Sequence, residues 1–205
     1  KAITNKTKVI FIANPNNPTG TLIGKTEIKN FLNNIPANII VVLDEAYDEY
    51  LTEEHKSEAF SWLATFENLI ISRSFSKAYG LAGLRVGFGV GSSSLIEIMN
   101  RIRQPFNVNY LAQQAAIASL DDDDFIQLSK KINSQGIKQI SEALDNLDIQ
   151  YIPSFGNFIS FKLEDESQAM MYYHHFSLLA FIIKHLCGLL NFGKHMNTLF
   201  DMRRD

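Results

Sequence analysis

The stretch KVIFIANPNNPTG, residues 8–20, decides the fold class of this chain. An apolar run, Lys8–Ala13, stops there at a turn rich in Asn, Pro and Gly. The same pattern returns twice, where NIIVVL (38–43) stops at DEAYDEY and NLIIS (68–72) stops at RSFSKAYG. Near-continuous apolar runs, rather than alternating ones, are typical of strands buried on both faces of a parallel sheet.

The segment between the first two runs has the spacing of a helix. Apolar residues recur along Thr26–Ile35 at Ile28, Phe31, Leu32 and Ile35, and Thr26 is the expected N-cap. A strand, a helix and a second strand at this spacing form a βαβ unit. The sequence therefore predicts an α/β fold.

Helical patterns dominate the middle of the chain. We expect helices over Ser94–Gln104 and Tyr110–Leu120, and one long amphipathic helix from Asp124 onward in which Gly136 takes an apolar position. The run Asp121–Asp124 is interpreted as helix capping, because carboxylates favour the positive end of a helix dipole; a four-acid metal site is the alternative. Ile152–Leu163 is expected to form a turn and an alternating strand that begin a smaller domain.

Composition excludes several classes of protein. The 205 residues are 46% hydrophobic and 20% charged, with a net charge of -3, so nothing points to nucleic acid or an anionic membrane as partner. Cys187 is the single cysteine, which rules out an internal disulfide and fits a reducing cytoplasm. The chain lacks an initiator Met, and we expect it to start inside a longer protein.

Polar residues at the three strand ends carry the candidate chemistry, because open α/β sheets bind ligands at the carboxyl ends of their strands. These residues are Asn17, Asp44, Tyr47, Ser74, Ser76, Lys77 and Arg85. A lysine forms an imine with an aldehyde, and a buried Asp keeps a pyridine nitrogen protonated. Tyr47 and Asn17 suit a ring oxygen, while the two serines and the arginine suit a phosphate. Pyridoxal phosphate needs all of these groups.

The spacing is compatible with one small ligand. Lys77 and Arg85 lie eight residues apart with two glycines between them, so the chain can fold back to reach both ends of the ligand. Asp44 and Tyr47 face opposite ways on a regular strand, so they converge only if the strand ends near Glu45 or Ala46. Taken singly, each motif has an ordinary structural interpretation as a turn, a solvated strand end or a surface lysine. Their order on successive strand ends favours a site.

Three motifs carry a resemblance to a known family: NPNNPTG, VVLDEAYDEY and SRSFSKAYGLAGLRVGFGVG. From about Lys8 to Leu163 the chain resembles fold-type I, class I/II pyridoxal-phosphate aminotransferases, and within them the histidinol-phosphate aminotransferases. The resemblance implies a three-layer α/β/α large domain with a mainly parallel sheet, followed by a smaller α+β domain. It also implies homodimers with shared sites.

The resemblance assigns roles to the candidate residues. Lys77 would form the internal aldimine and act as general acid and base, Asp44 would pair with the pyridinium nitrogen, and Tyr47 and Asn17 would contact the 3-hydroxyl oxygen. The cofactor phosphate would be bound by Ser74, Ser76 and Arg85. Asn157 would lie near the substrate. The implied reaction moves an amino group between L-histidinol phosphate and 2-oxoglutarate in histidine biosynthesis.

The chain also departs from the family. We expect residues 1–120 to be a partial cofactor-binding domain, 121–163 the interdomain helix and the start of the small domain, and 164–205 a poorly matching segment. The resemblance implies a Gly-rich phosphate loop and a Tyr that reaches the partner site, both of which we expect in a segment before residue 1. Arg203 and Arg204 are expected to be solvated. An amino-acid-phosphate decarboxylase and a truncated, non-catalytic remnant therefore remain alternatives.

Overall fold

The computed structural model describes residues 2–163, and the expectations for residues 164–205, Arg203 and Arg204 among them, lie outside this range. The chain divides into two compact units. Among the described residues, the first contains residues 2–140 and 152–160, and the second contains residues 141–151 and 161–163. The candidate site residues all lie in the first unit.

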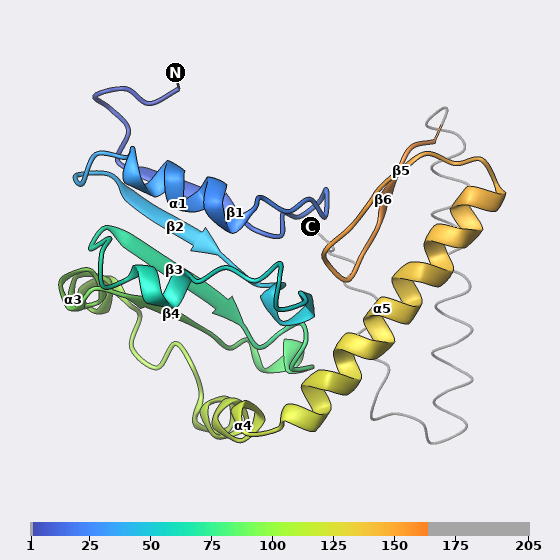
Figure 1. Cartoon of the computed structure of the whole chain (residues 1–205). Coiled ribbons are helices and arrows are strands. Elements are labelled where there is room, and N and C mark those ends of the chain that lie inside the picture. Colours follow the sequence, from blue (N-terminus) through green and yellow to red (C-terminus); the bar gives the residue numbers. More distant parts are fainter. Residues whose placement is uncertain (1, 164–205) are drawn as a thin grey trace. The chain divides into compact units, whose positions relative to one another are not determined.

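A four-stranded sheet forms the centre of the first unit (Figure 1). Its strands are β1 (Val9–Ala13), β2 (Ile40–Asp44), β3 (Leu69–Ser74) and β4 (Gly87–Gly91), and they follow one another in that order. The first three are parallel, and β4 is antiparallel to β3. The predicted α/β fold with a mainly parallel sheet is confirmed.

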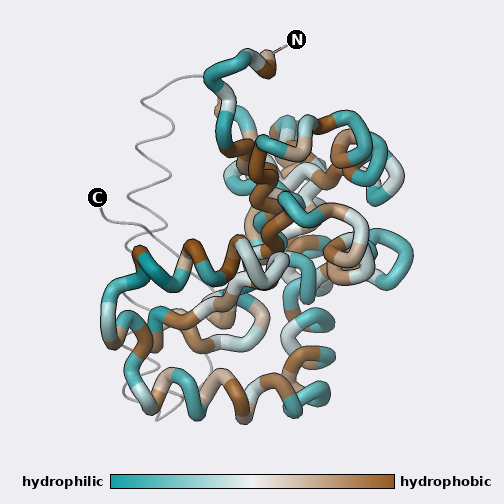
Figure 2. The backbone as a smooth tube through the Cα atoms, turned by 90° about the vertical axis from the view of Figure 1, so that its left-hand side faces the viewer, coloured by the Kyte–Doolittle hydropathy of each residue, from teal (hydrophilic) through white to brown (hydrophobic). Residues whose placement is uncertain are grey.

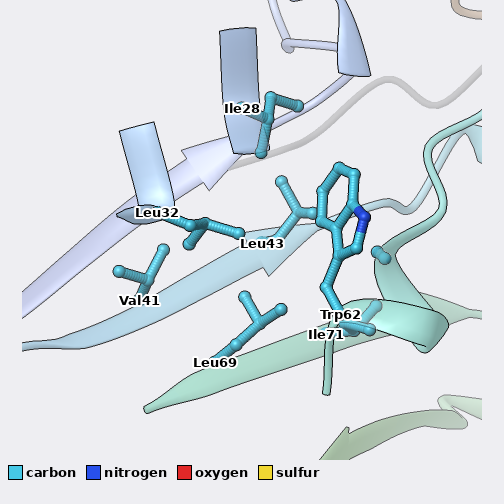
Figure 3. Close-up of a cluster of buried hydrophobic side chains, with 8 residues drawn as sticks. Ile28, Leu32, Val41, Leu43, Trp62, Leu69 and Ile71 are labelled. Atoms are coloured by element: carbon cyan, nitrogen blue, oxygen red, sulfur yellow. The ribbon is translucent and has the colours of Figure 1, made fainter. Parts of the chain in front are cut away.

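One face of the sheet carries the larger core. The register pairs Val41 with Leu69 and Leu43 with Ile71, which places these four fully buried side chains on the same face. Helices α1 (Lys25–Asn33) and α2 (Ala59–Trp62) supply Ile28, Leu32, Ala59 and Trp62 to the same cluster (Figure 3). Burying each large apolar side chain contributes about 1.5–3 kcal/mol. This cluster fixes β2 and β3, the strands that lead to the candidate site.

The opposite face of the sheet is only partly covered by the described residues. Leu69, Ile70 and Ile71 are all buried, so the expectation of burial on both faces holds for β3. It is wrong for β1, where Phe11 is 76% exposed. Phe11 pairs with Val42 and so lies on the face opposite the core residues Val41 and Leu43, and the described residues leave that face of β1 largely open.

The helices agree closely with the sequence pattern. The structure has α3 (Ser93–Ile102), α4 (Tyr110–Leu120) and α5 (Asp123–Asn146), and apolar and polar residues alternate along the helices (Figure 2). Asp122 Oδ1 accepts a hydrogen bond from the amide of Phe125 at 3.1 Å, which supports the capping interpretation of the acidic run. The predicted N-cap Thr26 is wrong: α1 begins at Lys25 after Gly24, whose amide donates to the Glu27 carboxylate at 3.3 Å.

The remaining elements are short. Two of them are 3₁₀ turns. The first, η1 (Asp48–Tyr50), follows β2, and the second, η2 (Ala82–Leu84), precedes β4. The strand expected within Ile152–Leu163 is reduced to a two-stranded sheet of β5 (Tyr151–Ile152) and β6 (Ser160–Phe161). Within residues 2–163, we find no helix with the length and apolar character that a membrane span requires.

Candidate active site

The segments that follow β1, β2 and β3 leave the sheet at one edge. The three strands run in the same direction, so the chain after Ala13, Asp44 and Ser74 emerges at their common carboxyl end. Open parallel sheets bind ligands at this edge. The individual contacts decide which of the predicted residues come together there.

Asn17, Tyr47 and Lys77 come together from three different loops. The side-chain Nδ2 of Asn17 donates a hydrogen bond to the Tyr47 hydroxyl at 2.9 Å. The ammonium Nζ of Lys77 lies 5.5 Å from the centre of the Tyr47 ring, within the range of a cation–π contact. The Tyr47 ring is buried and meets Phe158 edge-on, with ring centres 5.3 Å apart. The loops thus place an amide, a phenol and an amine side by side.

The NPNNPTG turn is held by its own polar groups. The amide of Gly20 donates to the Asn16 carbonyl at 2.7 Å, and the amide of Asn16 donates to the Thr21 carbonyl at 2.9 Å. The buried Asn14 side chain both donates to and accepts from the backbone of Ile23, at 3.0 and 2.7 Å. Asn14, Asn16 and Gly20 therefore form the hydrogen bonds that hold the turn, and the Asn17 side chain can bond to Tyr47.

Asp44 and Tyr47 meet the condition that the sequence imposes on them. Strand β2 ends at Asp44, and the amide of Ala46 donates to Asp44 Oδ1 at 3.1 Å. Tyr47 then has φ -118° and ψ 6°, which is no longer a strand conformation. The chain turns at once after the strand, so the two side chains are not forced to opposite faces.

The two serines of the expected phosphate site are linked, whereas Arg85 bonds within its own turn. Ser74 is the last residue of β3, and its Oγ accepts a hydrogen bond from the amide of Ser76 at 3.0 Å. Arg85 adopts a left-handed conformation with φ 52°, and its Nη1 donates to the Ala82 carbonyl at 2.9 Å. The structure therefore groups the serines and gives Arg85 a hydrogen bond elsewhere.

Asn157 lies at the hydroxyl of Tyr50. Burial raises the pKa of Tyr50 to about 12, although hydrogen bonds from Ser129 and Asn157 act in the opposite direction. A phenol with this pKa stays neutral at physiological pH. Asn157 thus belongs to a partly buried polar contact at Tyr50, the last residue of η1.

The sequence pattern missed one buried group entirely. Arg73, in β3, forms ion pairs with Glu45 at 2.6 Å, Asp48 at 2.8 Å and Glu49 at 3.1 Å. The available signal was the acidic spacing of DEAYDEY together with an arginine near the end of the next strand. Acidic residues beside a strand end are usually solvated, so this spacing alone carries little information.

The fold is that of an α/β protein whose candidate site, with its lysine, lies at the carboxyl edge of a mainly parallel sheet. The chain belongs to the family described as aminotransferase class I and II, whose family model matches residues 1–185. The resemblance carried by the three motifs is therefore confirmed. The match also extends beyond Leu163, where that resemblance ends.

Individual relatives narrow the similarity. The histidinol-phosphate aminotransferase of Methylobacillus flagellatus is 59% identical over 167 residues, which are 82% of this chain and 45% of that protein. The crystal structure of histidinol-phosphate aminotransferase from Sinorhizobium meliloti in complex with pyridoxal-5'-phosphate has a TM-score of 0.73 at 28% identity, over 78% of this chain and 43% of that chain. The chain thus spans about half the length of the relatives that it matches.

A related enzyme of different chemistry has a similar structure. The L-threonine-O-3-phosphate decarboxylase from Porphyromonas gingivalis has a TM-score of 0.70 at 30% identity, over 80% of this chain and 50% of that chain. The fold is therefore shared between an aminotransferase and a decarboxylase. The fold alone therefore determines neither the substrate nor the reaction.

Proposed function

We propose that this chain is part of a pyridoxal-phosphate-dependent aminotransferase that acts on L-histidinol phosphate and 2-oxoglutarate. The observation that carries the proposal is the arrangement of Asn17, Tyr47 and Lys77 at the carboxyl edge of the sheet. The 59% identity to a histidinol-phosphate aminotransferase supports the choice of amino donor. We also propose that the protein works in the cytoplasm.

The residues at one end of the site fit this cofactor well. When bound, pyridoxal phosphate supplies an aldehyde that reacts with an amine and a ring that withdraws electrons. Lys77 would supply the amine at its Nζ, and the Asn17–Tyr47 pair would bind the ring's 3-hydroxyl oxygen. Asp44 would hold a proton at the ring nitrogen. Each role needs a group of the type found there.

The phosphate end fits in part. The Ser76 backbone amide already donates a hydrogen bond to the Ser74 hydroxyl at 3.0 Å, and both groups can bind phosphate oxygens. Arg85 would have to exchange its hydrogen bond with the Ala82 carbonyl for one to phosphate. We assign phosphate binding to Ser74, Ser76 and Arg85. We assign to Lys77 the proton transfer that transamination requires.

The assembly is proposed as a homodimer. Large apolar side chains on α3, α4 and the segment between them are exposed, among them Ile102, Phe106 and Leu111. Phe106 is fully exposed, at 100%. Exposed apolar side chains gathered in this way mark interaction surfaces, and most soluble oligomers are symmetric dimers. Asn157 would lie near the substrate in the assembled site.

Two alternatives are separated by the same experiment. A decarboxylase is favoured by the structural similarity to the threonine-phosphate enzyme, and a non-catalytic remnant is the second alternative. Only the decarboxylase releases carbon dioxide from threonine phosphate. Only the aminotransferase forms glutamate from histidinol phosphate and 2-oxoglutarate. A remnant does neither.

The cofactor assignment is tested by titrating the chain with pyridoxal phosphate. We expect an absorbance band near the visible edge in the unmodified chain and no such band in Lys77→Ala. Lys25→Ala is the matched control, because Lys25 is an exposed lysine paired with Glu58 at 2.9 Å. A band that survives in Lys77→Ala contradicts the lysine assignment. A chain that shows no band supports the remnant.

A further inference from the structure

A buried charge cluster joins the segment after β2 to the end of β3. This Arg73 cluster consists of Arg73, Glu45, Asp48 and Glu49. The side chains of Arg73 and Glu45 are only 12% and 1% exposed. Two guanidinium nitrogens, Nε and Nη2, donate to the same Glu45 oxygen at 3.0 and 2.6 Å. Such charge-assisted hydrogen bonds are stronger than those between neutral groups.

Further contacts hold the cluster in place. The Ser57 hydroxyl donates to the other Glu45 oxygen, and the guanidinium of Arg73 lies 5.1 Å from the centre of the Phe60 ring. Both residues come from the segment that leads into and forms α2. The cluster is therefore packed and hydrogen-bonded rather than solvated, and its geometry is fixed by several independent contacts.

The cluster and the candidate site occupy opposite faces of β3. The register places Asp44 beside Ser72, and Ser74 follows on the same face. Arg73 lies between the two serines in sequence, so its side chain points to the other face. Its carboxylate partners are close sequence neighbours of Asp44 and Tyr47. Each residue of the cluster is thus attached to a segment that carries a site residue.

The backbone ladder ends where the cluster begins. The last register pair between β2 and β3 is Asp44 with Ser72, and the amide of Glu45 donates to the Ser72 carbonyl at 3.0 Å. Past this point β2 has ended, and residues 45–49 turn away through η1. Side-chain contacts to Arg73 then link these residues to β3, four residues before Lys77.

We infer that Arg73 is a positioning residue for the aminotransferase site: by binding Glu45, Asp48 and Glu49, it holds the segment of Asp44 and Tyr47 at a fixed distance from Lys77. The inference rests on the proposed function, because the positions matter only if these residues bind the cofactor. Arginine is required because its planar fork reaches several carboxylates at once. A lysine ammonium has the charge without the fork.

The test compares Arg73→Lys with Arg101→Lys in the full 205-residue chain. Arg101 is the matched control, since it is 69% exposed and pairs with Glu97 at 2.9 Å on the surface of α3. The readouts are the unfolding temperature, the affinity for pyridoxal phosphate measured well below that temperature, and amide hydrogen exchange of residues 44–50 and 72–78 without cofactor. Exchange follows local opening and does not depend on the cofactor.

We expect Arg73→Lys to weaken the affinity about tenfold, as loss of a charge-assisted hydrogen bond would, and to accelerate exchange in both segments. Arg101→Lys should change neither. The inference is overturned if Arg73→Lys lowers the unfolding temperature but binds the cofactor as tightly as the control. That result would give Arg73 a purely structural role.

Two further outcomes of this experiment can be told apart from a failure of the inference. If the unmodified chain fails to bind pyridoxal phosphate, the proposed function fails, and the exchange of the two segments alone decides whether Arg73 orders them. If Arg73→Lys does not fold, Glu45→Gln replaces it, because its amide oxygen still accepts from the guanidinium. Glu45→Gln should weaken cofactor binding to a smaller extent, and unchanged binding in this variant overturns the inference.

Discussion

The amide of Asn17 donates its hydrogen bond to the hydroxyl of Tyr47 across 30 positions of sequence, at 2.9 Å. The bond joins the turn after β1 to the turn after β2. Because the ring of Tyr47 is buried and packed against Phe158, its hydroxyl has a defined position. This one contact connects two of the motifs that the sequence presents separately.

Replacing Tyr47 by Phe should weaken cofactor binding with little loss of fold. The substitution keeps the ring and its packing against Phe158 but removes the hydroxyl. Loss of one hydrogen bond costs about 0.5–1.5 kcal/mol, or roughly a twofold to tenfold loss of affinity for pyridoxal phosphate. An absorbance titration measures it, with Tyr110→Phe, at an exposed tyrosine, as the control. Equal affinities in the two variants would exclude a role for the hydroxyl.

Replacing Gly20 by Ala should destabilise the turn that carries Asn17. Gly20 has φ 73°, which disfavours a side chain, and an added Cβ would lie 2.2 Å from Ser154 Oγ. We expect a loss of about 1–3 kcal/mol in the free energy of unfolding. Gly83→Ala is the control, because a Cβ at Gly83 meets none of the described residues within 4 Å. Denaturant unfolding measures both, and the same midpoint for both would contradict the expectation.

Replacing Gly136 by Ala should have the opposite effect. Gly136 lies inside α5, and no atom of the part of the chain that the structure describes lies within 4 Å of an added Cβ there. Alanine restricts the unfolded chain and favours the helix, so the free energy of unfolding should rise by about 0.5–1 kcal/mol. Thermal unfolding followed by circular dichroism measures the change. A lower unfolding temperature would show that the helix needs flexibility at this position.

Much of the fold was predictable because its signals are local. Each apolar run that stops at a polar segment became a strand of the sheet, and α4 has the predicted bounds, Tyr110–Leu120. The turn at NPNNPTG was predictable for the same reason, since Asn and Gly satisfy the hydrogen-bonding groups of the neighbouring backbone. What the sequence did not contain is the coverage of each face. The sequence pattern favours Phe11 as a core residue, but its side chain lies on the face of β1 that the described residues leave open.

The Arg73 cluster was not predictable because its members meet only in three dimensions. Arg73 and Glu45 are 28 residues apart, and their contact follows from the register of β2 and β3. The same acids could equally have faced water. The predicted N-cap of α1 was wrong because a side-chain contact decides where the helix begins. The Glu27 carboxylate accepts a hydrogen bond from the amide of Gly24, so the helix starts before Thr26.

Glu49 should make the stability of the protein depend on pH. Burial raises the pKa of Glu49 above its ordinary value of 4.5, and the attraction of Arg73 does not offset it. The pKa of Arg73 is itself raised by the three carboxylates despite its burial. The pKa values of Glu49 and Arg73 can both be raised, because the single guanidinium of Arg73 is shared among three carboxylates. One oxygen of Glu49, Oε2, is buried and has no hydrogen-bond partner within residues 2–163, so its negative charge is poorly compensated.

Glu49→Gln should therefore flatten the pH profile of stability. Since the folded state holds the proton of Glu49 to a higher pH than the unfolded state, the free energy of unfolding falls as the pH rises from about 4.5 through the raised pKa. Glutamine does not titrate, so the variant should lose part of this fall and unfold at an equal or higher temperature near neutral pH. Some pH dependence should remain, because burial also raises the pKa of Glu45. Thermal unfolding between pH 4.5 and neutrality measures the profile, with Glu54→Gln at an exposed position as control. If Glu49→Gln and the control both follow the unmodified chain, folding does not raise the pKa of Glu49 and the prediction is wrong.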